Sequence, residues 1–228
     1  MPKKQSKSMS SPPAFVVKDC ALIALATGKH ARTLKGLRDH LESIDADSIY
    51  YHFWGSLLRS HFEHPEYHND FASWAAYSLN DKVTAERLGA IDPLEFETLE
   101  GLRIELLELI DERIDELDTL QASTRDKQFE FISSDIVVFT TQMRLHQPQD
   151  LLEVLPELSL GSIFYHFIDA RRRTSASIDD ISLWLGDLDA RYQPLIEGLA
   201  KIDPYFSSLT QLKTDISEEL SRQLLERA

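Results

Sequence analysis

Residues 48–53 read Ser48-Ile49-Tyr50-Tyr51-His52-Phe53, and this motif returns 114 positions later as Ser162-Ile163-Phe164-Tyr165-His166-Phe167. The 114-residue register holds without a gap from Phe15 and Phe129 to Arg59 and Arg173. It then resumes at a spacing of 110, where Asp70 and Trp74 match Asp180 and Trp184. Self-similarity at a fixed spacing is typical of a structural unit that occurs twice, so the sequence predicts two copies of one unit.

The predicted copies cover residues 14–120 and 129–228, and a polar linker, residues 121–128, joins them. Residues 1–13 are rich in Lys and Ser and precede any apolar run, so we expect a disordered tail and no signal peptide. A unit of about a hundred residues buries a small core. The two units are therefore expected to pack together about a pseudo-twofold axis.

Charge and cysteine content exclude several classes of protein. The 228 residues carry a formal net charge of −14, which disfavours a broad nucleic-acid-binding surface. The single cysteine, Cys20, excludes an intrachain disulfide and fits a reducing, cytoplasmic location. It lies in an apolar run and is expected to be a buried hydrophobe. Lys18 and Asp19 interrupt that run, which is also too short to span a bilayer, so no membrane association is predicted.

Hydrophobic spacing predicts a mostly α fold. Thr33 is a suitable N-cap for a helix over Leu34–Ser43. The last helix of each copy has one apolar stripe with charged residues on its other faces: Leu99, Leu102, Leu106, Ile110 and Ile114 in the first, and Leu209, Leu212, Ile216, Leu220 and Leu224 in the second. The start of each copy is ambiguous. Phe129–Phe131 and Ile136–Phe139 resemble strands, whereas Ala21–Thr27 favours helix. A short strand pair at the start of each unit is the alternative left open.

The residues that recur in both copies form the candidate ligand site. On a helix, His52 and Arg59 share one face because they are seven positions apart. Arginine suits phosphate or carboxylate, and a nearby histidine can donate or transfer a proton, so the two copies together would bind an anion or a sugar-phosphate-like ligand. The candidate residues are Tyr51, His52, Arg59, Asp70, Trp74, Tyr165, His166, Arg173, Asp180 and Trp184.

The same residues also fit a purely structural interpretation. Each histidine would then be a hydrogen-bonded interior group, each arginine would pair with the aspartate that follows it, and the tryptophans would fill the core. Asp70 and Asp180 each precede a tryptophan by one helical turn, which suits an N-cap or an arginine partner. Both interpretations stay open at this point.

A second cluster, His61, His64 and His68, has a spacing that could suit a divalent metal. Pro65 interrupts any helix there and the second copy has no counterpart, so a polar loop is the preferred interpretation and no metal or cofactor is predicted. The sequence also contains no glycine-rich phosphate loop, HExxH helix or nucleophile elbow. Catalysis therefore has no support from a motif.

Two families share parts of this pattern. The run at 48–53, after a helix over Leu34–Ser43, resembles the recognition-helix end of TetR-type repressors. That resemblance implies DNA binding. The stretch is acidic where a DNA-reading helix needs Lys and Arg, and the motif also occurs in the C-terminal half.

The whole span 14–228 is similar to an uncharacterised prokaryotic family known only as a domain of unknown function. The similarity rests on Asp19-Cys20, the motif at 48–53, the run Asn69–Trp74 and Ile91-Asp92-Pro93. It implies no activity. The second copy departs from this pattern at Ser133-Ser134 and Asp179–Ile181, so the first copy is the expected working half.

The sequence thus predicts a non-enzymatic binding or adaptor module whose partner is a small anionic ligand or a protein. A TetR-like regulator, and a small-molecule enzyme that uses His52 as acid or base, are the alternatives.

Overall fold

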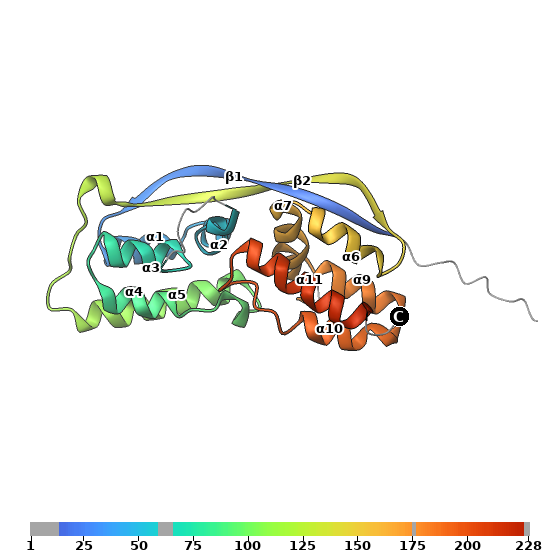
Figure 1. Ribbon diagram of the computed structural model, residues 1–228. Coiled ribbons are helices and arrows are strands. Elements are labelled where there is room, and N and C mark those ends of the chain that lie inside the picture. Colours follow the sequence, from blue (N-terminus) through green and yellow to red (C-terminus); the bar gives the residue numbers. More distant parts are fainter. Residues whose placement is uncertain (1–13, 59–65, 175–176, 226–228) are drawn as a thin grey trace, which may run out of the picture.

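The computed structural model describes residues 14–58, 66–174 and 177–225. Its dominant feature is a long antiparallel ribbon made of β1 (Phe15–Ala31) and β2 (Phe129–Leu145). Leu22 pairs directly with Ile136, and the register shifts only between Val16 and Lys18 and between Ala26 and His30. The helices lie together on one side of this ribbon, beneath it in Figure 1.

The expectation of a mostly α fold is wrong, because the described chain has an α+β fold. The error lies in Ala21–Thr27, whose Ala and Leu favour a helix when they are considered alone. In the structure Ala21–Ala26 pairs residue by residue with β2, where Ile136, Val137 and Val138 are strong strand formers. Pairing with a distant segment therefore overrides the local preference.

The structure also does not support two repeated helical units, each with its own strand pair. The two strands belong to one shared sheet, and each packs on helices from the opposite half of the chain. Phe15 of β1 contacts His166 and Trp184, whereas Phe129 of β2 stacks on Phe71. Neither half of the chain therefore packs its strand against its own helices alone.

The helices form an N-terminal and a C-terminal group (Figure 1). The first group comprises α1 (Leu34–Leu41), α2 (Ala46–Trp54), α3 (Asp70–Tyr77), α4 (Lys82–Gly89) and α5 (Leu99–Glu116). The second comprises α6 (Asp150–Val154), α7 (Leu160–Ile163), α8 (Ala170–Arg173), α9 (Asp180–Leu188), α10 (Gln193–Leu199) and α11 (Leu209–Leu225).

The motif at 48–53 and its second occurrence differ in backbone form. The first lies within α2, an ordinary α-helix. The second spans the end of α7 and a π-helical turn over Phe164–Asp169 that leads into α8. The two helix groups therefore also differ in detail.

Several local predictions are confirmed. Thr33 caps α1 by accepting the N–H of Gly36 at 3.1 Å. On α5 the stripe residues Leu102, Leu106 and Ile110 are buried, and on α11 all five stripe residues are buried. Cys20 is 8% exposed.

Within the described residues, no helix is both long and apolar enough to cross a membrane.

Candidate functional site

His52 of α2 joins a helix to a strand. Its Nδ1 lies 2.9 Å from Oδ2 of Asp70, the first residue of α3, and its Nε2 accepts the backbone N–H of Ile132 in β2 at 3.1 Å. A backbone N–H can only donate, so the ring proton resides on Nδ1 and is donated to Asp70. The His52 side chain is 3% exposed and packs against Phe129. Both ring nitrogens are therefore engaged inside the protein.

His166 makes the matching contacts in the other half of the chain. Its Nδ1 lies 2.8 Å from Oδ2 of Asp180, and its Nε2 accepts the backbone N–H of Lys18 in β1 at 2.9 Å. This side chain is also 3% exposed. Asp70 and Asp180 are the first residues of their helices, and the residues before them, Asn69 and Asp179, provide the N-caps. Of the two roles expected for Asp70 and Asp180, the N-cap role is therefore wrong by one position, whereas Asp180 does have an arginine partner, Arg173.

Arg173 completes the second of these sites. Its guanidinium lies 3.9 Å from the centre of the Tyr165 ring and donates to Asp180 and to Asp169. Burial opposes ionisation of Asp180, but hydrogen bonds from His166 and Arg173 outweigh it and lower the pKa of this carboxyl below its ordinary value. The predicted pairing of Arg173 with the following aspartate is present.

The other predicted residues lie in the interior around the ribbon. Trp74 donates its ring N–H to the carbonyl of Lys127 at 2.9 Å, and Trp184 packs against Phe15. Tyr51 is buried beside His52. Arg59 lies outside the described residues, so its predicted role stays a prediction.

The histidine cluster is only partly described, since His61, His64 and Pro65 lie outside the described residues. His68 packs against Tyr205 and Phe206, and burial lowers its pKa. Across residues 14–58, 66–174 and 177–225, no group of three His, Cys, Asp or Glu side chains could hold a metal ion.

A buried carboxylate, Asp169, organises a cluster that sequence analysis missed. It accepts hydrogen bonds from Tyr50 at 3.2 Å, Arg172 at 3.2 Å and Arg173 at 2.7 Å, and its side chain is 2% exposed. Burial, and then the charge of Asp169, raises the pKa of Tyr50 well above its ordinary value. Arg172 also lies over the Tyr50 ring, 4.8 Å from its centre.

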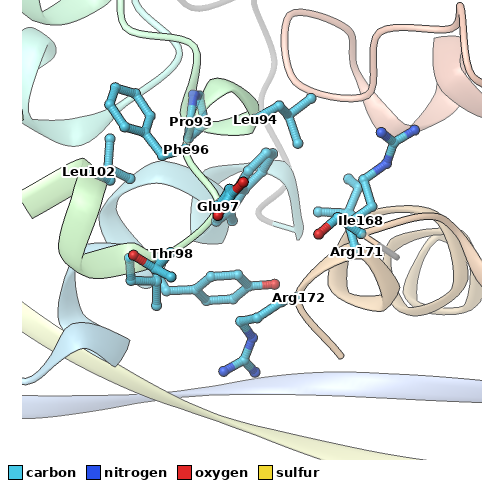
Figure 2. A pocket seen from close by; sticks show the side chains of 13 residues that line it. Pro93, Leu94, Phe96, Glu97, Thr98, Leu102, Ile168, Arg171 and Arg172 are labelled. Atoms are coloured by element: carbon cyan, nitrogen blue, oxygen red, sulfur yellow. The ribbon is translucent and has the colours of Figure 1, made fainter. Parts of the chain in front are cut away.

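This cluster borders a cleft between the two helix groups. The cleft has a volume of about 150 Å³. One wall carries Ile168, Arg171 and Arg172, and the facing wall carries residues 93–99 with Phe96, Glu97 and Thr98 (Figure 2). Tyr50 and Trp54 of α2 and Leu102 of α5 also line the cleft. In Figure 2 the guanidinium groups of Arg171 and Arg172 extend in opposite directions.

The repeated pattern did not indicate the cleft, because it selects residues that occur in both copies. At the 114-residue spacing, Asp169, Arg171 and Arg172 match Gly55, Leu57 and Leu58, which share none of their chemistry. The one available signal was the run Arg171-Arg172-Arg173 in an otherwise acidic chain.

The motif helix α2 has no surface for reading DNA. All residues from Ser48 to Trp54 are buried, and a recognition helix must expose one face to the groove. The local resemblance to TetR-type repressors therefore lies in a helix that packs in the core.

Comparison with known proteins gives one family and one solved structure. The model described as "Family of unknown function (DUF5752)" matches residues 12–221. "The structure of OrfY from Thermoproteus tenax" has 30% sequence identity and a TM-score of 0.80, and the match covers 96% of this chain and 97% of that one. No curated protein matches. The expected membership of an uncharacterised family is confirmed.

Proposed function

Since the chain belongs to DUF5752, a family of unknown function, we propose from its own geometry that it is a binding module for a small anionic ligand. The proposed site is the cleft between the two helix groups. The observation that carries the proposal is the presence of two arginines, Arg171 and Arg172, on one wall of a cleft in a protein whose net charge is −14.

The two arginines differ in how much of their hydrogen-bonding capacity the protein uses. Arg172 is held by Asp169 and lies 3.5 Å from Asp47. Arg171 donates from Nε to the carbonyl of Phe167 at 3.2 Å, and no other hydrogen bond from it is found among the described residues. Its terminal nitrogens are therefore available to a phosphate or carboxylate, which a guanidinium binds with two parallel hydrogen bonds.

The other residues that line the cleft indicate which class of anionic ligand it would bind. Glu97 can accept hydrogen bonds from hydroxyl groups, and Tyr50, Trp54 and Phe96 offer apolar ring surfaces. This combination suits a phosphorylated sugar or a similar polyol phosphate. The cleft volume of about 150 Å³ lies below the roughly 300–1,000 Å³ of sites that enclose drug-sized ligands, so the proposed ligand is a single small molecule.

In this proposal the histidines of the repeated motif support the fold and do not bind the ligand. His52 and His166 are buried, and each already bridges an aspartate and a strand. The same contacts leave no ring nitrogen of His52 for a substrate, which disfavours its use as an acid or base.

A calorimetric and thermal-shift panel tests the proposal with inorganic phosphate, hexose phosphates and the corresponding unphosphorylated sugars. A ligand at 100 times its dissociation constant adds about 2.7 kcal/mol. In a chain of this size that raises the Tm by roughly 5–10 °C. Phosphorylated sugars should stabilise the protein more than either phosphate or sugar alone.

The matched variants are Arg171→Ala in the cleft and Arg125→Ala, an exposed arginine in a turn outside it. Loss of a charge-assisted hydrogen bond costs about 1.5–3 kcal/mol, so Arg171→Ala should weaken binding by roughly 10- to 100-fold. Arg125→Ala should bind as the wild type does. Equal binding by both variants, or no response to any compound in the panel, would reject the cleft as the site.

A further inference from the structure

The backbone of the ribbon is exposed along part of its outer edges. Residues 18–26 pair with 132–140 without a register shift. The N–H groups of Lys18 and Ile132 go to His166 and His52, so they point away from the partner strand. In an antiparallel pair, successive residues point alternately toward and away from the partner strand. Ile136, Val138 and Thr140 therefore also direct their N–H and C=O groups outward from β2.

The ribbon has two outer edges, one on β1 and one on β2, and each is occupied at one end from within the protein, whereas the middle of the β2 edge is not occupied by any described residue. His52 takes the N–H of Ile132, and His166 takes the N–H of Lys18. On β1 the N–H of Cys20 is taken by the carboxylate of Asp19. Among the described residues no helix, loop or side chain provides an acceptor for the outward N–H of Val138. A strand edge of this kind is a template for pairing with another strand.

The side chains near this open edge are apolar and exposed. Val137, Val138 and Phe139 are 37%, 41% and 52% exposed, and Met143 is 39% exposed. No charged residue occurs between Ile136 and Met143, although 27% of the whole chain is charged. The stretch is rich in β-branched residues, uncharged and free of proline, which are the properties that favour intermolecular strand pairing.

The charge distribution identifies a second copy of this chain as the partner. With a net charge of −14, two copies repel each other over most of their surfaces. When one strand pairs antiparallel with itself about a twofold axis at Val138, residues equally far on either side of Val138 face each other. The exposed Val137 of each copy then lies opposite the exposed Phe139 of the other, and Asp135 lies opposite the uncharged Thr141. The uncharged stretch Ile136–Met143 avoids that repulsion.

β2 suits this pairing better than β1. The outward N–H of Cys20 on β1 already has an acceptor, and the centre of β1 is rich in alanine, which is a weaker strand former. We propose that two copies of the chain pair antiparallel along the Ile136–Thr140 edge of β2, which joins their ribbons into one four-stranded sheet.

Hydrogen exchange combined with molar-mass measurement tests this interface on the full-length protein. At about 100 µM the protein should be a dimer by light scattering, and dilution to about 1 µM should shift it toward monomer by mass action. The amide of Val138 should exchange roughly tenfold more slowly in the dimer, because only a second chain can accept its hydrogen bond. The amide of Val137, which points toward β1, should be protected at both concentrations.

Two proline variants separate the β2 edge from the β1 edge. Val138→Pro removes an outward N–H and leaves the hydrogen bonds between β1 and β2 intact, and a proline is tolerated at such an edge position. Ala24→Pro makes the same change at an outward position on β1. Val138→Pro should be monomeric at about 100 µM with an unchanged circular dichroism spectrum, and Ala24→Pro should remain dimeric.

If Val138→Pro disturbs folding, Val138→Lys provides the same test, since an edge lysine opposes self-pairing. The proposal is overturned by a wild-type protein that stays monomeric at the high concentration. It is equally overturned by a dimer in which the Val138 amide exchanges as fast as in the monomer, because two sheets packed face to face would leave that amide free.

Discussion

The Nε2 atom of His52 lies 3.1 Å from the amide nitrogen of Ile132, a residue 80 positions further along the chain. His166 makes the corresponding contact with Lys18 at 2.9 Å, across 148 positions. Each histidine ties a helix from one half of the chain to the strand that begins the other half. Hydrogen bonds to two buried imidazoles therefore link the ribbon to the helices.

Replacing His52 with alanine should destabilise the protein by about 2–4 kcal/mol, because the N–H of Ile132 loses its acceptor and a cavity opens beside Phe129. Urea denaturation measures the change. His30→Ala, at an exposed position on the same ribbon, is the control and should stay within about 0.5 kcal/mol of wild type. Equal stability of the two variants would contradict the role assigned to His52.

Replacing Asp169 with alanine should cost about 2 kcal/mol. Breaking a fully buried ion pair costs about 3–5 kcal/mol, but Arg172 and Arg173 are partly exposed and water will solvate them when the carboxylate is lost. Thermal denaturation should show a Tm lower by roughly 4–8 °C. The exposed Asp118→Ala variant should melt with the wild type. A Tm for Asp169→Ala that matches this control would show that the cluster does not contribute to stability.

Asp180 should make stability depend on pH in the acidic range. Burial alone would raise the pKa of its carboxyl, but hydrogen bonds from His166 and Arg173 lower it below 3.8 in the folded protein. Its contribution is therefore present above the unfolded-state pKa of about 3.9 and is lost as the pH falls through the folded-state value. Unfolding measured from pH 6 down to pH 2 should show this loss.

The Asp180→Asn variant tests that assignment. It should be less stable than wild type at pH 6 and should lose less stability than wild type on acidification. Asp187→Asn, an exposed change in the same helix, should keep the wild-type pH profile. A profile of Asp180→Asn parallel to that of wild type would rule out Asp180 as a source of the dependence.

Two glycine substitutions should have opposite effects. A Cβ at Gly161 would overlap the backbone carbonyl of Cys20, where α7 packs closely on β1. Gly161→Ala should therefore destabilise the protein by about 1–3 kcal/mol. Gly186→Ala, in α9, would bring its Cβ no nearer than 3.8 Å to Ile196 and should stabilise the helix by up to about 1 kcal/mol. Calorimetric melting measures the stability of both variants. A Gly161→Ala variant as stable as wild type would show that α7 and β1 are not in such close contact.

Cys20 should be almost unreactive in the native protein. Burial, followed by the charges of Asp169 and Asp19, raises the pKa of its thiol to about 12. At pH 8 about one thiol in ten thousand is then ionised, and the thiolate is the reactive form. Labelling with a thiol reagent should be far slower in buffer than in denaturing urea. Similar rates in the two conditions would show that Cys20 is accessible.

Local features were predictable from the sequence because neighbouring residues determine them. The stripe on α11 follows from the spacing of Leu209, Leu212, Ile216 and Leu220, and Thr33 could be identified as a cap from its position before a periodic run. The pairing of Arg173 with Asp180 was predictable for a related reason, since the two residues are only seven positions apart.

The candidate site was only partly predictable. Repetition drew attention to His52 and His166, but it could not indicate that their Nε2 atoms accept hydrogen bonds from the backbones of Ile132 and Lys18. The cleft depends on residues 93–99 and Arg171 approaching each other from opposite halves of the chain. No spacing rule connects those segments.

The sequence by itself thus determined the helices with a clear apolar stripe, the burial of Cys20 and membership of an uncharacterised family. Only the tertiary structure decided that Ala21–Thr27 is a strand, that β1 pairs with β2, and that the two helix groups enclose a cleft. The physical reason is the range of the interactions. Caps and stripes depend on residues within about one or two helical turns, whereas a strand such as β1 is stable only when a distant segment satisfies its backbone hydrogen bonds.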